Sequence, residues 1–271
     1  ATSASSASDT HFNPVAYYYL DETSGTTAYD ALGNYNGTVN GASLTDGKIG
    51  QGYSFDGVYD YIDIGYIDFS SSDFSIGGWF YFDNTPTSRM VLISQGINEG
   101  NGDSVVIQAW ENGKIQFSFY GVEYEIFSTL TIQRGWIYIV CSYESSSKTM
   151  KIYVNGNLDK TGTSKAGPTV GGTSTYLGSN VNWDKIVPEY FNGKMDEVGI
   201  WDKVLTPEQV YQLYTYTAPT YTIGAEEQSE GVSITLNSPA DELQSTSSNI
   251  NFNATITPRE ATIKNVTLKL N

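Results

Sequence analysis

The stretch Phe74-Ser75-Ile76-Gly77-Gly78-Trp79-Phe80-Tyr81-Phe82 carries the clearest structural signal in this chain. Large apolar side chains recur in it at every second position, which puts Phe74, Ile76, Phe80 and Phe82 on one face. Successive side chains of a β-strand point to opposite faces, so this alternation predicts a strand with one face in a hydrophobic core. We therefore expect partner strands in the flanking sequence.

Two hairpins are predicted on the C-terminal side of this strand. Apolar residues alternate over 105–109 and again over 115–119, with Asn112-Gly113 between them. A second alternating run, 150–154, is followed by Asn155-Gly156. Asn and Gly both tolerate positive φ, so Asn-Gly between alternating runs is a strong hairpin signal. Many short strands at this spacing predict an antiparallel sandwich of two sheets.

One short helix is expected near residues 206–214. Thr206 and Gln209 have the spacing of a capping box, and Pro207 suits the first helical position. Apolar residues then recur with helical spacing at Val210, Leu213 and Tyr214. The expected fold class is therefore all-β, a two-sheet sandwich with one short helix towards its C-terminal end.

The composition argues against several classes of function. The 271 residues include 30 acidic and 14 basic side chains, for a net charge of −16. This charge repels phosphates, so we expect no nucleic-acid partner, and no apolar run is long enough to predict membrane insertion. Cys141 and His11 are the single Cys and the single His. An internal disulfide is therefore impossible, and catalysis or metal binding through His is not expected.

The organisation along the chain suggests four segments. Residues 1–11 form a polar lead-in, 12–217 the sandwich, 218–231 a linker and 232–271 a second β segment. Strands are expected in this last segment at 232–236, 250–254 and 266–270. Three strands do not close a sandwich, so their apolar face and open edges call for more strands. Either the native chain continues past Asn271, or another subunit supplies a strand, which would be self-assembly.

The block from Tyr17 to Tyr214, roughly three quarters of the chain, resembles the laminin G-like, concanavalin A-like jelly-roll family. The matching segments occur in the family's order, at residues 19–25, 30–38, 47–57, 60–62, 74–79, 135–136, 152–156 and 191–201. The resemblance implies a two-sheet jelly roll. The tail from Val232 resembles the first strands of an immunoglobulin-like domain of extracellular adhesins.

The family resemblance also implies a structural Ca²⁺ that joins an early loop to a late strand. Asp196 shares its parity with Val198 and Ile200, so its carboxylate is expected to point inward, where an unpaired charge is costly. The early loop offers Asp30 and Asn34, whose oxygens are of the kind that Ca²⁺ prefers. The alternatives are that Asp30 and Asn34 only make turns, that Asp196 caps backbone N–H groups, or that Asp196 pairs with Lys194.

A glycan-binding face is the second candidate site. Sugar binding requires flat apolar platforms with short polar groups beside them. The residues that fit this requirement, as expected loop aromatics with Asn or Asp nearby, are Tyr59, Asp60, Tyr61, Trp183 and Tyr190. Trp183 stands out because its segment is polar and has no periodicity. The alternative is that these aromatic residues are ordinary strand formers and core residues.

Catalysis is not expected. Glu123 and Glu125 share one face of a strand, but the Glu-x-Asp-x-x-Glu pattern of concanavalin-like hydrolases does not occur in the sequence. A solvated acidic face explains the two glutamates more simply. Cys141 lies in an alternating apolar run and is expected to be a small buried residue, not a nucleophile.

Three glycosylation sequons are present, at Asn36, Asn253 and Asn265. With the resemblance, they suggest a secreted glycoprotein, located extracellularly or on a cell or virion surface. We interpret the chain as a non-catalytic binding or adhesion module of a larger surface or filament protein, with a glycan or protein partner. The alternatives are a structural subunit of an appendage, sheath or virion, and an accessory module of a carbohydrate-active enzyme.

Overall fold

The computed structural model describes residues 12–70, 72–96, 104–119, 125–169, 174–180 and 189–216, together with four strands between residues 222 and 269. By internal contacts the chain divides into two units, residues 11–216 and residues 1–10 with 217–271. The first unit holds two antiparallel β-sheets and one helix, so the expected all-β sandwich is confirmed.

The first sheet is built around the stretch at residues 74–82. Within the described part of the chain it has eight strands. Seven follow one another in the order β14 (Asn157–Thr163), β13 (Thr149–Val154), β12 (Gly135–Glu144), β7 (Phe74–Phe82), β16 (Asn192–Trp201), β5 (Gln51–Asp56) and β4 (Ser43–Asp46). The eighth, β1 (Ala16–Tyr18), also pairs with β16. Because β7 lies between β12 and β16, the stretch that dominates the sequence is a central strand.

The second sheet also has eight strands in the described part of the chain. Their order is β11 (Glu125–Phe127), β10 (Ile115–Phe119), β9 (Ser104–Ala109), β8 (Met90–Gly96), β15 (Thr175–Leu177), β6 (Tyr61–Asp63), β3 (Gly37–Asn40) and β2 (Thr27–Ala28). Both predicted hairpins are present. Residues 110–114 connect β9 to β10, and Asn155-Gly156 connects β13 to β14.

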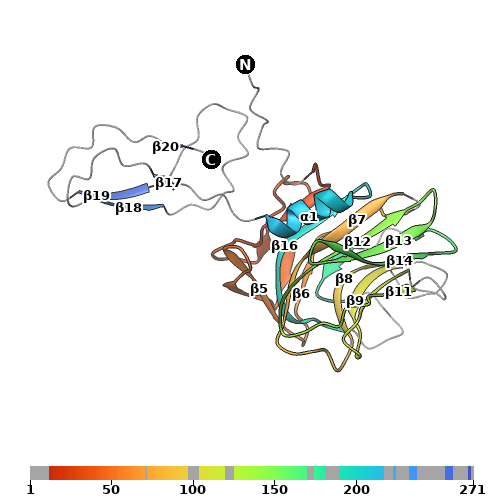
Figure 1. The fold of residues 1–271 in the computed structure, drawn as a ribbon. Coiled ribbons are helices and arrows are strands. Elements are labelled where there is room, and N and C mark those ends of the chain that lie inside the picture. Colours follow the sequence, from red (N-terminus) through yellow and green to blue (C-terminus); the bar gives the residue numbers. More distant parts are fainter. Residues whose placement is uncertain are drawn as a thin grey trace, which may run out of the picture. The chain divides into compact units, whose positions relative to one another are not determined.

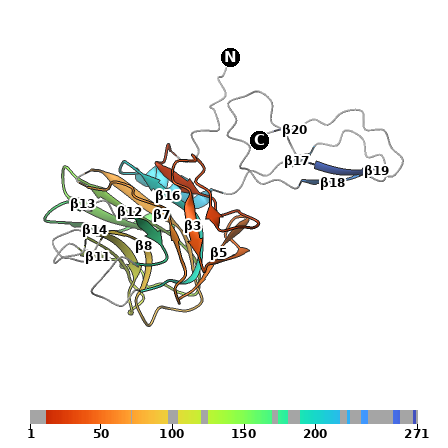
Figure 2. The same ribbon diagram turned by 180° about the vertical axis from the view of Figure 1, so that it is seen from behind.

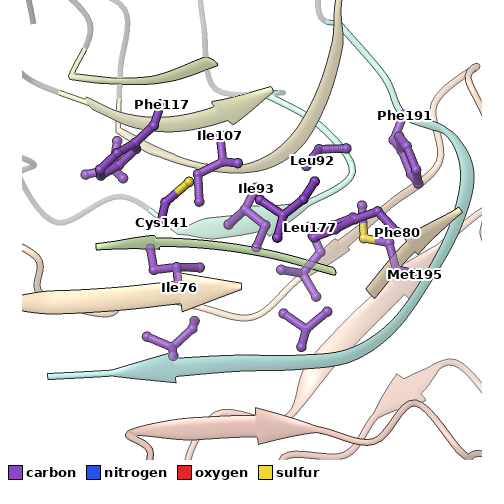
Figure 3. Packing of buried hydrophobic residues seen from close by; sticks show 14 of the residues in the cluster. Ile76, Phe80, Leu92, Ile93, Ile107, Phe117, Cys141, Leu177, Phe191 and Met195 are labelled. Carbon is purple, nitrogen blue, oxygen red and sulfur yellow. The ribbon is translucent and has the colours of Figure 1, made fainter. Parts of the chain in front are cut away.

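The main core lies between the two sheets. Phe74, Ile76, Phe80 and Phe82 are all buried in it, as the alternation predicted. Figure 3 shows Ile76 and Phe80 of β7 among side chains from the second sheet, including Ile93, Ile107 and Leu177. Because the side chains of the two sheets interdigitate in this core, an atom added to a central strand would disturb the packing around it.

The helix α1 (Pro207–Thr215) covers the outer face of the first sheet (Figures 1 and 2). Its capping box is formed as predicted: Gln209 N–H donates to Thr206 Oγ1, and Thr206 N–H donates to Gln209 Oε1. Val210 and Leu213 pack in a second apolar cluster on that face. Its other buried members are Tyr17, Trp79, Tyr138, Val140, Tyr153, Trp201 and Leu205.

A β-bulge interrupts β16 between Asp196 and Gly199, and Glu197 within it has a φ of 51°. The bulge shifts the alternation, so that Met195, Val198 and Ile200 face the main core. Asp196 instead pairs with Trp79, whose side chain belongs to the helix-covered face. The expectation that Asp196 shares a face with Val198 and Ile200 is therefore wrong, because a bulge adds a residue that parity counting does not see.

The second unit contains two described strand pairs. β18 (Val232–Leu236) pairs with β19 (Ala254–Pro258), and β17 (Thr222–Ile223) pairs with β20 (Leu268–Lys269). β18 coincides with an expected strand, whereas β19 begins where the expected 250–254 strand ends. The immunoglobulin-like character of this segment stays a prediction.

Cys141 is fully buried in the main core, and burial raises the pKa of its thiol well above the ordinary value. We expect the native protein to be unreactive towards a thiol reagent such as Ellman's reagent at mildly alkaline pH. The same protein unfolded in guanidinium chloride should release one equivalent of chromophore. Rapid reaction of the native protein would contradict the buried position.

Candidate functional site

Four tyrosines gather at one end of the outer face of the second sheet. Tyr59 and Tyr190 have ring centroids 5.3 Å apart, and the rings of Tyr61 and Tyr176 lie 5.7 Å apart in an edge-to-face arrangement. Burial raises the pKa of the Tyr190 hydroxyl, and the nearby Tyr59 and Tyr61 raise it further. We call these four residues the tyrosine cluster. The structure thus brings together the predicted Tyr59, Tyr61 and Tyr190.

The backbone explains how this cluster forms. Tyr59 has a φ of 64° in the turn between β5 and β6, and its side chain is 71% exposed. Ile62 and Leu177 face the core, so Tyr61 and Tyr176, their neighbours on adjacent strands, face outward. Tyr190 arrives through an isolated bridge with Ser179. Tyr176 was missed from the sequence because nothing near it distinguishes an outward tyrosine from an inward one.

Asp60 does not belong to this outward face. Its side chain is buried, and its Oδ2 accepts a hydrogen bond of 2.8 Å from Asp56 N–H. Its Oδ1 fills the space in which a Cβ on Gly41 would lie. Asp60 therefore holds the turn that presents Tyr59, and the prediction that it contacts a ligand is corrected. Burial raises its pKa, an effect that the bond from Asp56 partly offsets.

Beside the cluster, the outer face continues into an aromatic and charged group. The Arg89 guanidinium lies 4.1 Å from the Trp110 ring centroid, and Trp110 meets Phe127 edge to face at 5.6 Å. Arg89 also pairs with Glu189 at 3.8 Å, and Glu189 precedes Tyr190. This ion pair connects Trp110 to the tyrosine cluster. The sequence showed no sign of it, because its members are far apart in the chain.

Polar side chains occupy the outer face between the aromatic residues. Ser94, Gln108, Gln116 and Ser118 are all buried there. Gln108 Nε2 donates to Gln116 Oε1, and Gln116 Nε2 donates to Glu125 Oε2. The exposed Glu125 is thus the end of a hydrogen-bonded chain. Glu123, the other predicted acidic residue, lies outside the described residues.

Some buried polar atoms at this face have no hydrogen-bond partner in the part of the chain that the structure describes. Asn180 Oδ1 accepts from Glu189 N–H at 2.6 Å, but Asn180 Nδ2 has none. Gln108 Oε1 and Ser104 Oγ share this condition. Unmade hydrogen bonds of buried groups are costly, and functional sites often contain them.

The predicted metal ligands Asp30 and Asn34 lie in a loop that Asp30 holds together by hydrogen bonds. Asp30 Oδ1 accepts hydrogen bonds from the backbone N–H groups of Tyr17 and Leu32, and Oδ2 accepts from those of Asn34 and Tyr35. Asp30 therefore organises its own loop, which was the alternative reading. Asn34 is exposed. Within the described residues, no group of three or more His, Cys, Asp or Glu side chains is placed to hold a metal ion.

Asp196 is fully buried beneath the loop at residues 47–51. Its Oδ2 accepts hydrogen bonds from Lys48 N–H (2.7 Å) and Ile49 N–H (2.8 Å), but its Oδ1 has no hydrogen-bond partner among the described residues. Burial raises the pKa of Asp196 to about 8, and the charge of nearby Asp21 adds to this effect. The Lys194 ammonium lies over the Tyr81 ring instead of pairing with Asp196. An unpartnered carboxylate oxygen beside a second carboxylate fits a bound cation.

The remaining predicted residues divide by position. Asn36 is exposed, and its Oδ1 accepts a hydrogen bond of 3.0 Å from Asp30 N–H. Trp183, Asn253 and Asn265 lie outside the described residues.

Among the helical residues that the structure describes, none form a segment long and apolar enough to cross a membrane.

Two antiparallel sheets with this strand order and a core between them form a jelly roll. The sequence comparison agrees with this fold. Residues 56–211, more than half of the chain, match a laminin G-type family model described as the concanavalin A-like lectin/glucanases superfamily. The chain belongs to this superfamily. A comparison with curated proteins found no match.

Solved structures with this fold share little sequence with the chain. Domain 4 of AbnA, an extracellular GH43 arabinanase from Geobacillus stearothermophilus in complex with arabinotriose, is 23% identical with a TM-score of 0.58. The match covers 75% of this chain and 98% of that domain.

Two further neighbours are longer proteins. The Trypanosoma rangeli sialidase is 17% identical (TM-score 0.58), with 74% of this chain and 32% of the sialidase chain covered. The binding domain of Paraclostridial Mosquitocidal Protein 1 is 16% identical (TM-score 0.60), with 76% and 52% covered. This chain therefore spans about a third of the sialidase and about half of the toxin domain. At these identities the likeness establishes the fold.

Proposed function

We propose that this chain is a non-catalytic glycan-binding module and that the tyrosine cluster is its binding surface. The observation that carries the proposal is the meeting of Tyr59, Tyr61 and Tyr190 on one outward face, beside the buried Tyr176. Sugar rings have apolar C–H faces that pack on aromatic rings, while their hydroxyls need short polar partners. Asp63, which pairs with Tyr176 in the sheet, supplies such a group beside the rings.

The exposure of Tyr59 supports this function. A tyrosine at positive φ that is 71% exposed stabilises the fold little, and its backbone conformation is strained for a bulky residue. Asp60 holds the turn in this conformation through its bond to Asp56 N–H. The fold therefore maintains an exposed aromatic platform, which a purely structural surface would not require.

Absence of catalysis is part of the proposal. A glycosidase requires two carboxyl groups on either side of the scissile bond. On this face Glu189 pairs with Arg89, and Glu125 accepts a hydrogen bond from Gln116. Burial raises the pKa of Glu189, and the charge of Arg89 opposes this effect.

The setting that best suits such a module is extracellular. It would serve in adhesion within a larger surface protein, or as an accessory module of a carbohydrate-active enzyme. The extracellular arabinanase domain seen with arabinotriose supports both roles by analogy of fold. We also propose a structural Ca²⁺ held by Asp196 and Asp21. It would supply the partner that Asp196 Oδ1 lacks and would hold the loop at residues 47–51 on β16.

Removal of the tyrosine rings tests the binding proposal. We expect Tyr190→Ala, and separately Tyr59→Ala, to weaken binding to the best glycan on an array at least about tenfold by calorimetry. Tyr211→Ala is the matched control, because Tyr211 is 48% exposed on α1, over the other sheet. The proposal fails if the folded protein binds no glycan, or if the Tyr211 variant loses as much affinity as the others.

A further inference from the structure

We propose that Asp63 makes this surface select neutral glycans with adjacent free hydroxyls and reject glycans that carry a carboxylate. This inference rests on the proposed glycan-binding function and names the class of ligand. It is carried by the place of Asp63 in the sheet and by the charges around it.

Asp63 lies on the outer face in the same row as the cluster. It pairs with Tyr176 on one side and with the exposed Thr38 on the other. Tyr61 is two residues earlier on the same strand and therefore shares its face. Ile62 and Ile64, on either side of Asp63 in sequence, are buried in the core, which confirms that Asp63 points outward. A sugar packed on the half-buried Tyr61 would have its edge beside this carboxylate, because Tyr61 and Asp63 share one face of β6.

The Asp63 carboxylate is free to accept hydrogen bonds from a ligand. Its Oδ1 accepts one bond of 3.0 Å from Gly65 N–H, which holds the side chain in a defined orientation. No described residue donates a hydrogen bond to its Oδ2. A carboxylate accepts at both oxygens, so it can receive bonds from two neighbouring hydroxyl groups of a sugar.

The charge of Asp63 has no neutralising partner in the described part of the chain. The ion pair found there joins Arg89 to Glu189, so the guanidinium nearest the cluster is already engaged. Arg89 is further held against the Trp110 ring. The chain as a whole has a net charge of −16. A uronic or sialic acid on the tyrosines would therefore bring a second carboxylate to Asp63, and among the described residues no unpaired cation is found there to offset the repulsion.

The test compares Asp63→Asn with wild type on matched pairs of glycans. One pair is a galactan and a galacturonan, and another is a galactose-terminated oligosaccharide with and without terminal sialic acid. We expect wild type to favour the neutral member of each pair at least about fivefold at low salt. Asp63→Asn should reduce this preference to less than about twofold, because Asn can keep the bond to Gly65 N–H but has no charge. Asp202→Asn, a change at an exposed acid after β16 on the first sheet, should preserve the preference.

The outcomes separate this inference from the function on which it rests. Binding to acidic glycans that equals or exceeds binding to neutral ones, and that is lost in Tyr190→Ala, overturns the inference and leaves the proposed function standing. An unchanged preference in Asp63→Asn, with unchanged thermal stability, also overturns it. Absence of binding to every glycan contradicts the proposed function itself.

Discussion

Replacing Gly77 by alanine is expected to lower the free energy of unfolding by at least about 3 kcal/mol. Gly77 lies at the middle of β7, between Val140 of β12 and Gly199 of β16. A Cβ at this position would overlap the Ile139 carbonyl oxygen and lie 2.8 Å from Val140 Cα. Both atoms belong to the backbone of the neighbouring strand, so the sheet itself would have to move.

The measurement is guanidinium unfolding followed by tryptophan fluorescence. Gly33→Ala is the matched control, because a Cβ on Gly33 meets nothing within 4 Å but the residue has a φ of +75°. This variant should lose about 1–2 kcal/mol through backbone strain alone. If Gly77→Ala lowers the free energy of unfolding no more than Gly33→Ala does, β7 and β12 are not in the close contact that the structure shows.

The second large effect concerns Asp196 and pH. Burial raises the folded-state pKa of Asp196 from 3.8 to about 8, so between these pH values the folded protein binds a proton that the unfolded chain has released. The contribution of Asp196 to stability is therefore fully present below the unfolded-state pKa and is lost as the pH rises through the folded-state pKa. The prediction applies with a chelator present. Between about pH 5 and about pH 8, the free energy of unfolding of the wild type should fall by roughly 3–4 kcal/mol more than that of Asp196→Asn.

Calcium should reverse this loss if it binds at Asp196. A cation favours the ionised carboxylate and binds only the folded state, so Ca²⁺ at 100 times its dissociation constant adds about 2.7 kcal/mol. We expect Ca²⁺ to raise the melting temperature of wild type at pH 8 and to leave that of Asp196→Asn unchanged. Equal pH profiles for both proteins would contradict the pKa assignment. The absence of a Ca²⁺ effect on wild type would exclude the cation.

The residues of the proposed glycan-binding surface illustrate how far the sequence can lead. Tyr59, Tyr61 and Tyr190 were predictable because aromatic residues in polar segments are unlikely to be core. Asp60 looked like part of the same group, but its carboxylate turns back to Asp56 N–H and Gly41, a local loop geometry that the residue type does not reveal. Tyr176 joins the site through the pairing of β15 with β6, and Arg89 joins it through an ion pair with Glu189, both over long sequence separations.

The sequence alone determined the features that depend on short-range rules. Alternation in residues 74–82 specifies a strand and its buried face, Asn155-Gly156 specifies a hairpin, and Thr206 with Gln209 specifies a helix start. Each signal acts over a few residues, so no distant partner is needed to interpret it.

Only the tertiary structure decided the environment of Asp196. Parity predicted a carboxylate turned into the core, but the bulge in β16 turns it to the opposite face. It is buried there all the same, because the 47–51 loop closes over it and donates the N–H groups of Lys48 and Ile49. These donors lie almost 150 residues away in sequence. Their approach depends on the pairing of β5 with β16, and strand register is a property of the whole sheet, not of any short segment.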